Sequence, residues 1–344
     1  MKPLTLLTAL MLLCTACAPA ISLPERTVLR VMVYDSFSIS EEVIAQFEAA
    51  HDVTVQFLQA GDTGAMLNQA ILTRDNPQAD VLYGVDNTFL SRALDADIFI
   101  PYPAASIVRV PEALHLDPEY RAIPVAYGDV CLNYDRDYFA EHDLPVPQRL
   151  ADLTAPEYRG LLVVQNPASS SPGLAFLITT IGAFGEAGYL DFWADLRAND
   201  VLVVEGWSTA YYDEFRGGPR PLVVSYATSP AAEVYFSEAP LDIPPTGAII
   251  APDACFRQVE FAGILAGTTQ RDLAEAFIDF LLDDAFQSDI PLQMWVYPAS
   301  STAELPSVFV EHALTAESPV SVPASAIEQH REQWIQAWTE TVLR

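Results

Sequence analysis

The sequence predicts an α/β fold of two lobes with a ligand cleft between them. Strand and helix patterns alternate through the first hundred residues, and a second alternating block begins near residue 160. Extended segments near 123–131 and 246–257 connect the two blocks and are candidate hinges. Such alternation indicates parallel sheets flanked by helices, in which ligands bind beyond the carboxyl ends of the strands.

The first block is expected to contain strands separated by two helices. The pattern Ser38-Ile39-Ser40-Glu41 predicts a capping box at the start of the first helix. The apolar spacing of Met66–Leu72 predicts the second helix. The expected strands are Thr27–Tyr34, Asp52–Leu58 and Ala79–Gly84.

The rest of the chain continues the alternation and ends in a helix. Ile123–Asn133 is an extended run that we expect to break at Gly128-Asp129. In the last helix, Pro323–Leu343, the four-residue spacing of Trp334 and Trp338 predicts packing on one face rather than ligand contact. The other expected elements are strands Leu161–Gln165, Val201–Glu205, Pro221–Tyr226, Ala248–Ile250 and Val259–Phe261, and helices from about Pro172, Tyr189–Arg197 and Asp272–Leu282.

A chain of 344 residues is long enough for two domains. The first lobe is assigned to residues 27–125 plus about 250–298, and the second lobe to residues 126–249. Residues 299–344 are expected to form a helical segment that packs on the lobes.

The chain is strongly acidic. It has 17 basic and 46 acidic side chains, which give a net charge of −29. A surface this negative repels nucleic acid and anionic lipid, and it concentrates cations near a cleft. The alternative is that the charge only provides solubility in an acidic or salty habitat.

The N-terminus has the pattern of an export signal. Lys2 precedes an apolar run, Leu4–Leu13, that is too short to span a bilayer. The run ends in Cys14-Thr15-Ala16-Cys17, which resembles a bacterial lipobox. We therefore expect a lipoprotein signal peptide over residues 1–16, acylation of Cys17 and a tether over 17–26, with plain secretion as the alternative. The protein would lie on the outer face of the cytoplasmic membrane or in the periplasm.

Two cysteines remain beyond this segment, Cys131 and Cys255. In an exported protein an even pair is more often bridged than free, so we expect a disulfide between them. A metal site is not expected, because no CxxC occurs beyond the N-terminal segment and the five histidines lack ligand spacing.

Short aromatic and acidic stretches follow several predicted strands and indicate a site for a flat, cationic small molecule. Trp207 lies between Gly206 and Ser208, a turn-like setting that favours ligand contact over core packing. Trp295, Tyr34 and Tyr226 have patterns equally compatible with the core.

Two polar stretches have a functional and a structural interpretation. Asp62, in Gly61-Asp62-Thr63-Gly64, is placed to meet a cation or an amino group, or it forms a local Asx turn. The run Ser169-Ser170-Ser171-Pro172-Gly173 resembles a helix start, whose free N–H groups either hold a phosphate or are simply capped.

The chain resembles the periplasmic thiamine-binding proteins of ABC importers from about residue 28 to the last helix. This resemblance implies a type II periplasmic-binding-protein fold and a receptor without enzymatic activity or cofactor. Its partners would be thiamine or its phosphates, a permease and a separate ATPase, and we expect a monomer. The segments that carry the resemblance are Tyr34–Phe37, Ala79–Asn87, Ser171–Leu174, Gly206–Tyr211, Ser225–Pro230 and Trp295–Pro298.

The resemblance also implies roles for single residues. Tyr34, Tyr226 and Trp295 would enclose the aminopyrimidine ring, and Trp207 would lie against the thiazolium. Asp62 would pair with the positive charge or contact the exocyclic amine, and Ser170 would approach the hydroxyethyl group or its phosphate. The secondary contacts would be Asp35, Asp86, Ser169, Tyr211, Ser229 and Tyr297.

Two other functions are alternatives to this one. Ferric iron or another small cation is the alternative ligand, because related two-lobed proteins use a tyrosine pair and this chain has Tyr211-Tyr212. A secreted hydrolase is disfavoured, because the chain has no Gly-x-Ser-x-Gly elbow, no HExxH and no Ser–His pairing. We therefore expect no catalytic residues.

Overall fold

The computed structural model describes residues 26–344. The predicted signal peptide, the acylation of Cys17 and nearly all of the tether lie outside these residues. The predicted lobe boundaries at residues 125, 249 and 298 stay predictions.

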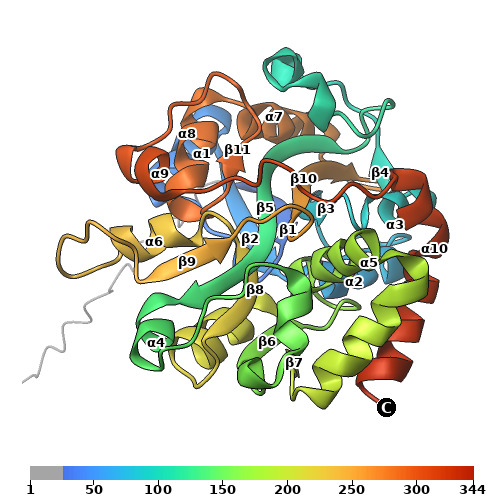
Figure 1. The fold of residues 1–344 in the computed structure, drawn as a ribbon. Coiled ribbons are helices and arrows are strands. Elements are labelled where there is room, and N and C mark those ends of the chain that lie inside the picture. The colour runs from blue at the N-terminus through green and yellow to red at the C-terminus, as the bar shows by residue number, and fades with distance from the viewer. Residues whose placement is uncertain (1–25) are drawn as a thin grey trace, which may run out of the picture.

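Parallel strands form the two ends of one long, curled sheet (Figure 1). At one end β1 (Thr27–Val33) pairs in parallel with both β2 (Val53–Gln59) and β3 (Val81–Asp86). At the other end β6 (Leu162–Gln165) pairs in parallel with β7 (Leu202–Val204) and β8 (Leu222–Tyr226). Both ends therefore have the parallel βαβ arrangement that the sequence predicts.

The middle of the sheet is antiparallel and connects the two ends. It consists of β5 (Ile123–Asp135), the long strand that crosses the centre of Figure 1, and β10 (Phe256–Leu265). The predicted break at Gly128-Asp129 is wrong, because both residues pair with β10 and the strand continues through them. The short strands β4 (Phe99–Ile100), β9 (Thr246–Ile249) and β11 (Tyr297–Pro298) pair with β10, β5 and β5, respectively.

Helices α1 (Glu41–His51), α7 (Arg271–Leu281) and α8 (Asp284–Gln293) pack together over the first end of the sheet. Their aromatic side chains interlock, and the Phe47 ring lies 5.1 Å from that of Phe277. α2 (Thr63–Leu72) and α3 (Leu90–Asp95) bury Met66, Leu67 and Ala93 in a separate core that lies on the opposite face of these strands.

The predicted capping box is wrong in detail. Ser40, not Ser38, is the N-cap of α1, and its side chain makes no cap hydrogen bond. The Ser38 hydroxyl instead donates to the Gln293 side chain (2.8 Å), and the Ser40 amide donates to Asp289 (2.8 Å). A tertiary contact with α8 thus replaces the local cap.

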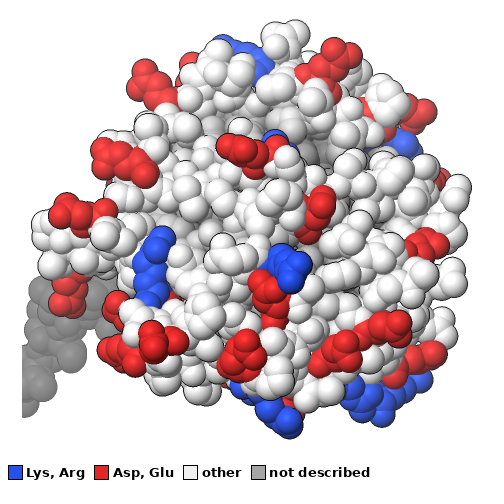
Figure 2. Space-filling view, viewed as in Figure 1, with Lys and Arg blue, Asp and Glu red and all other residues white. Residues whose placement is uncertain are grey.

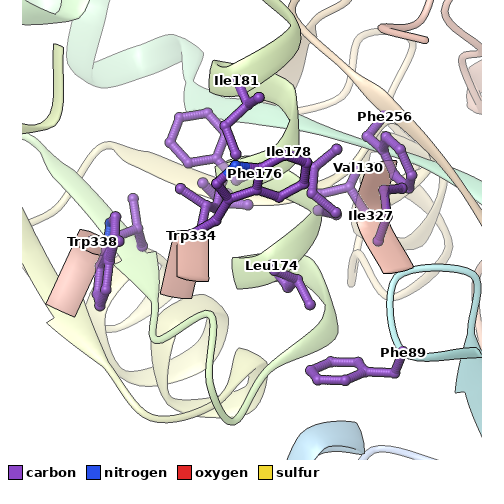
Figure 3. Packing of buried hydrophobic residues seen from close by; sticks show 14 of the residues in the cluster. Phe89, Val130, Leu174, Phe176, Ile178, Ile181, Phe256, Ile327, Trp334 and Trp338 are labelled. Carbon is purple, nitrogen blue, oxygen red and sulfur yellow. The ribbon is translucent and has the colours of Figure 1, made fainter. Parts of the chain in front are cut away.

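The second end of the sheet is covered by α5 (Ser171–Ala198), which packs against α10 (Ala324–Val342) (Figure 3). α5 contains a kink at Gly185, whose φ of 72° separates the two helical segments expected from the sequence. Trp338 is buried with its ring 5.4 Å from that of Trp193, and Trp334 is also buried, so their predicted packing role is confirmed.

Within residues 26–344, α5 is the helix that is long and apolar enough to cross a membrane, and 56% of that stretch is buried in the protein. It is therefore the core helix of this lobe. The remaining helices are α4 (Arg136–Glu141), α6 (Ser229–Tyr235), α9 (Ser307–His312), a π-helix (Thr209–Arg216) and 3₁₀ turns at Ala105–Arg109, Glu112–Leu114, Leu150–Thr154 and Pro156–Tyr158.

The predicted disulfide is confirmed. Cys131 of β5 is bonded to Cys255, which directly precedes β10, and both residues are fully buried. Next to it, Arg257 donates two hydrogen bonds of 2.8 Å to Asp129, whose carboxylate also accepts from the Ala316 amide (2.8 Å). A covalent bond and a bidentate ion pair thus hold the two central strands together.

Acidic side chains are dispersed over the surface rather than gathered in one patch. Figure 2 shows Asp and Glu on every part of the visible face, with few Lys or Arg among them. The visible face therefore has the acidic character that the net charge of −29 predicts.

We predict that replacing both bridged cysteines by alanine lowers the free energy of unfolding by about 2–5 kcal/mol, because the bond closes a loop of 124 residues. Urea denaturation of C131A/C255A and wild type measures the difference. Wild type treated with a reductant is the control and should match the variant. Equal midpoints for oxidised and reduced wild type would contradict the prediction.

Candidate ligand-binding site

A cavity of about 680 Å³ lies between the two ends of the sheet. Its walls come from the carboxyl ends of β1 and β8, the starts of α2 and the π-helix, the end of α8 and the middle of β10. This is the position expected of a ligand site in parallel α/β lobes.

Most of the residues predicted from the sequence meet at this cavity. They are aromatic or acidic side chains from segments far apart in the chain. Those on the wall are Tyr34, Asp35, Asp62, Trp207, Tyr211, Tyr226, Ser229 and Trp295.

Four predicted contact residues, Asp86, Ser169, Ser170 and Tyr297, are not among the lining residues. Ser170 is the N-cap residue of α5 and fully buried, so its hydroxyl has no access to the cavity. Asp86 is also fully buried and accepts a hydrogen bond from the Ser171 hydroxyl.

The other two of these residues are turned toward protein groups. The Ser169 hydroxyl donates to the backbone carbonyl of Glu205 (2.7 Å). The Tyr297 ring stacks on Tyr127 at 5.4 Å, within the pairing of β11 with β5. The position of Ser169 and Tyr297 along the sequence therefore did not predict where their side chains point.

Tyr34 depends on Gly84 for its position. Gly84 has a φ of 105°, and a Cβ there would lie 2.3 Å from the Tyr34 ring, so only glycine permits this approach. The Tyr34 hydroxyl lies 3.4 Å from the Glu260 carboxyl. Burial and the nearby Glu260 carboxyl raise the pKa of Tyr34 well above its ordinary value, so the phenol is neutral.

Trp207 is held on three sides. Its ring stacks on Tyr211 at 5.0 Å, its indole N–H donates to the Ser225 hydroxyl (2.9 Å), and its amide donates to Asp62 (3.1 Å). The Asp62 carboxylate also accepts from the Thr63 amide (2.8 Å) as the N-cap of α2. Asp62 is therefore an Asx-type cap that also bonds across the cleft.

Trp295 lies two residues beyond the end of α8, at an unusual backbone position. Its φ of 57° lies in the left-handed region, where a bulky residue is strained unless its surroundings hold it. Its carbonyl accepts from the Thr228 hydroxyl, and its indole lies 5.3 Å from the Tyr235 ring. Thr228 and Tyr235 belong to the region of α6, whereas the backbone of Trp295 follows α8. Trp295 is therefore held from both sides of the cleft.

Among the cavity-wall residues that sequence reasoning missed are Gln258 and Glu260, on the central strand β10. The signal was present, because polar residues alternate there with the buried Val259 and Phe261. In a strand at the centre of a sheet, such alternation indicates one face turned to a cavity.

Glu260 is the most perturbed acid of the site. It is 5% exposed, and burial raises its pKa to about 8, helped by the neighbouring Asp86 and Asp62. Within residues 26–344 it forms no ion pair; the basic residue of the wall, Arg216, pairs instead with Glu233 (3.0 Å). The cavity thus has aromatic walls and carboxyl groups that lack a cationic partner.

Comparison with known proteins identifies the family. Residues 76–316 match the bacterial extracellular solute-binding proteins. The chain belongs to this family. It is 32% identical to the thiamine-binding periplasmic protein of Escherichia coli over 97% of this chain and 98% of that protein. The corresponding protein of Brucella abortus is 29% identical over the full length of both chains.

Solved structures confirm the fold of this solute-binding protein. A periplasmic thiamin binding protein superposes with a TM-score of 0.81 at 27% identity, over 93% of this chain and 97% of that chain. The two-lobed type II periplasmic-binding-protein fold predicted from the sequence is therefore correct. A ferric binding protein from Campylobacter jejuni, at 16% identity and a TM-score of 0.74 over 91% of this chain and 99% of that chain, shares the fold.

The lobes of this solute-binding protein touch through polar contacts beside the cavity. Asp62 bonds to the Trp207 amide, and the Gly64 amide donates to the Ser169 carbonyl (2.9 Å). A Cβ on Gly64 would lie 2.7 Å from the Ala168 carbonyl oxygen, so glycine is needed for the close approach of α2 to the start of α5. These contacts hold the two walls of the cavity at their present separation.

We predict that Glu260→Gln makes the ligand-free protein more stable than wild type at pH 8 but not at pH 4. Folded Glu260 keeps its proton up to a pKa of about 8, whereas an unfolded glutamate loses it near 4.5. Wild type therefore loses stability as the pH rises between these values, and glutamine does not. The difference in free energy of unfolding between Glu260→Gln and wild type should increase by roughly 2–4 kcal/mol from pH 4 to pH 8.

Urea denaturation of both proteins from pH 4 to pH 9 measures this gap. Glu340→Gln, at an exposed glutamate of α10, is the matched control. Parallel pH curves for Glu260→Gln and wild type would show that the carboxyl is not protonated in the folded state.

Proposed function

We propose that this protein captures thiamine or its phosphates outside the cytoplasm and delivers the ligand to the permease of an ABC importer. The observation that carries the proposal is the convergence of Tyr34, Trp207, Tyr226 and Trp295 around one cavity that also contains carboxyl groups. Thiamine offers two flat rings for stacking and one permanent positive charge. Aromatic faces and unpaired carboxyls are the chemistry that binds such a molecule.

The relatives support this proposal, because two that match almost the whole chain are named thiamine-binding periplasmic proteins. In our proposal Tyr34, Tyr226 and Trp295 enclose the aminopyrimidine and Trp207 faces the thiazolium. Asp62 provides the negative charge from the edge of the cleft. The protein acts as a monomeric binding protein without catalysis, and a separate ATPase drives import.

The location follows from the same proposal. The protein works in the periplasm, or on the outer face of the cytoplasmic membrane if Cys17 carries a lipid. A disulfide between Cys131 and Cys255 agrees with an oxidising compartment.

Ferric iron is the less supported ligand. Tyr211 and Tyr212 both reach the cavity, but the Tyr211 hydroxyl is engaged by Glu233 (2.7 Å). Among the residues that the structure describes, no cluster of His, Cys, Asp or Glu is arranged to hold a metal ion. Calorimetric titration with thiamine, after ligand is stripped by unfolding and refolding, tests the proposal. One-to-one binding would support it; heat and colour with ferric iron alone would overturn it.

We predict that Trp207→Ala weakens thiamine binding by at least about 1 kcal/mol, because the variant loses a stacked ring beside the cationic thiazolium. Titration calorimetry measures the change. Trp207→Phe, which keeps an aromatic face, is the matched control and should retain most of the affinity. An unchanged Kd in Trp207→Ala would remove Trp207 from the site.

We also predict that Asp62→Asn weakens binding of thiamine more than binding of an analogue with a neutral ring in place of the thiazolium. Asparagine can still cap α2, so the fold is retained and the charge alone is removed. The two dissociation constants, measured for variant and wild type, give the comparison. Equal losses for both ligands would leave Asp62 as a structural cap only.

A further inference from the structure

Gln258 and Glu260 lie two residues apart on β10, so their side chains leave the strand on the same side. Both line the cavity, at 2% and 5% exposure. Val259, between them, is buried in the apolar core on the other side. The middle of the central strand therefore presents two polar groups to the ligand from a rigid support.

The hydrogen bonds of Gln258 are incomplete. Its Nε2 donates to the Tyr226 hydroxyl (3.1 Å). Its Oε1 is buried and has no hydrogen-bond partner among residues 26–344. Buried acceptors are rarely left unpaired, because the water lost on burial is not replaced. This oxygen is suited to a donor that the ligand brings.

Glu260 offers a different set of groups. Its carboxyl faces the neutral hydroxyl of Tyr34, and among the described residues no Lys, Arg or His forms an ion pair with it. Burial raises the pKa of this carboxyl to about 8, so at neutral pH it carries a proton. A protonated carboxyl donates through its hydroxyl and accepts through its carbonyl at the same time.

We propose that Gln258 and Glu260 recognise the amino edge of the aminopyrimidine ring and select it over a ring that has an oxo group there. The inference rests on the proposed function and deepens it. The Glu260 carboxyl accepts one N–H of the exocyclic amine and donates to the adjacent ring nitrogen. The Gln258 Oε1 accepts the second N–H of the same amine.

The two residues discriminate in different ways. A carboxylic acid pairs with either ring form, because its donor and acceptor can exchange places. The Gln258 oxygen cannot do so while its amide nitrogen is held by Tyr226. An oxo group opposite this oxygen would place two acceptors together and leave both unpaired, which sites built for a donor reject strongly.

The first test compares thiamine with oxythiamine, which has an oxo group in place of the amine, by titration calorimetry. We expect wild type to bind thiamine at least about tenfold more tightly than oxythiamine. Gln258→Met, which removes the acceptor, should reduce this ratio to about threefold or less. Gln336→Met, at an exposed glutamine of α10 outside the cavity, is the matched control, and its ratio of the two affinities should equal that of wild type.

The second test compares Glu260→Gln with Glu260→Met. Glutamine keeps one donor and one acceptor, so its thiamine affinity should stay within about threefold of wild type, whereas methionine should lose about tenfold or more. Thermal midpoints confirm that the variants fold.

The outcomes separate this inference from the proposed function. If wild type binds neither compound, the proposed function falls and the inference with it. If wild type binds thiamine but Gln258→Met keeps the full ratio, or oxythiamine binds more tightly, only the inference is overturned. It is also overturned if Glu260→Gln loses as much affinity as Glu260→Met, because Glu260 would then act through its charge.

Discussion

The antiparallel pairing of β5 with β10 is the constraint on which the rest of the molecule depends. Each lobe has its own parallel strands, and these two strands are the continuous backbone that passes between them. The Cys131–Cys255 bond and the ion pair of Arg257 with Asp129 prevent this junction from sliding. Any movement of one lobe against the other must therefore bend or twist these strands without changing their register.

The junction also forms the floor of the binding site. Because side chains alternate along a strand, β10 buries Val259 in a core and turns Gln258 and Glu260 to the cavity. Groups on a central strand are held in a fixed geometry by its pairing on both sides. In our proposal the floor therefore sets which ring edge is accepted, and aromatic residues on the lobes, such as Trp207 and Trp295, enclose the ligand.

The sequence predicts the alternation of strands and helices from local pattern, and the disulfide from the even number of cysteines beyond the export signal. Local pattern favours Trp207 as a contact, whereas the roles of Tyr34, Tyr226 and Trp295 came from the family resemblance. It does not predict where Ser170 and Tyr297 point, since neighbours distant in the chain decide that. The alternation along β10 indicates that Glu260 faces a cavity, but it does not indicate the protonation state of this residue. Its burial among Tyr34, Asp86 and Asp62 results from tertiary packing, and no local pattern reports a pKa raised by it.

The whole protein and its cavity are both acidic, and this disfavours the ionisation of further carboxyl groups. A net charge of −29 disfavours any further ionised carboxylate, and the cavity contains several acids with a single basic residue, Arg216, which is already paired. Burial, reinforced by the nearby Asp86 and Asp62, raises the pKa of Glu260 at the floor to about 8, so this acid keeps its proton at neutral pH and acts as a hydrogen-bonding group. Burial also raises the pKa of Asp62, whereas hydrogen bonds from Ser170 and from the Thr63 and Trp207 amides lower it. In our proposal these two carboxyls serve different parts of a cationic ligand: Glu260 pairs with its ring edge, and Asp62 faces its charge.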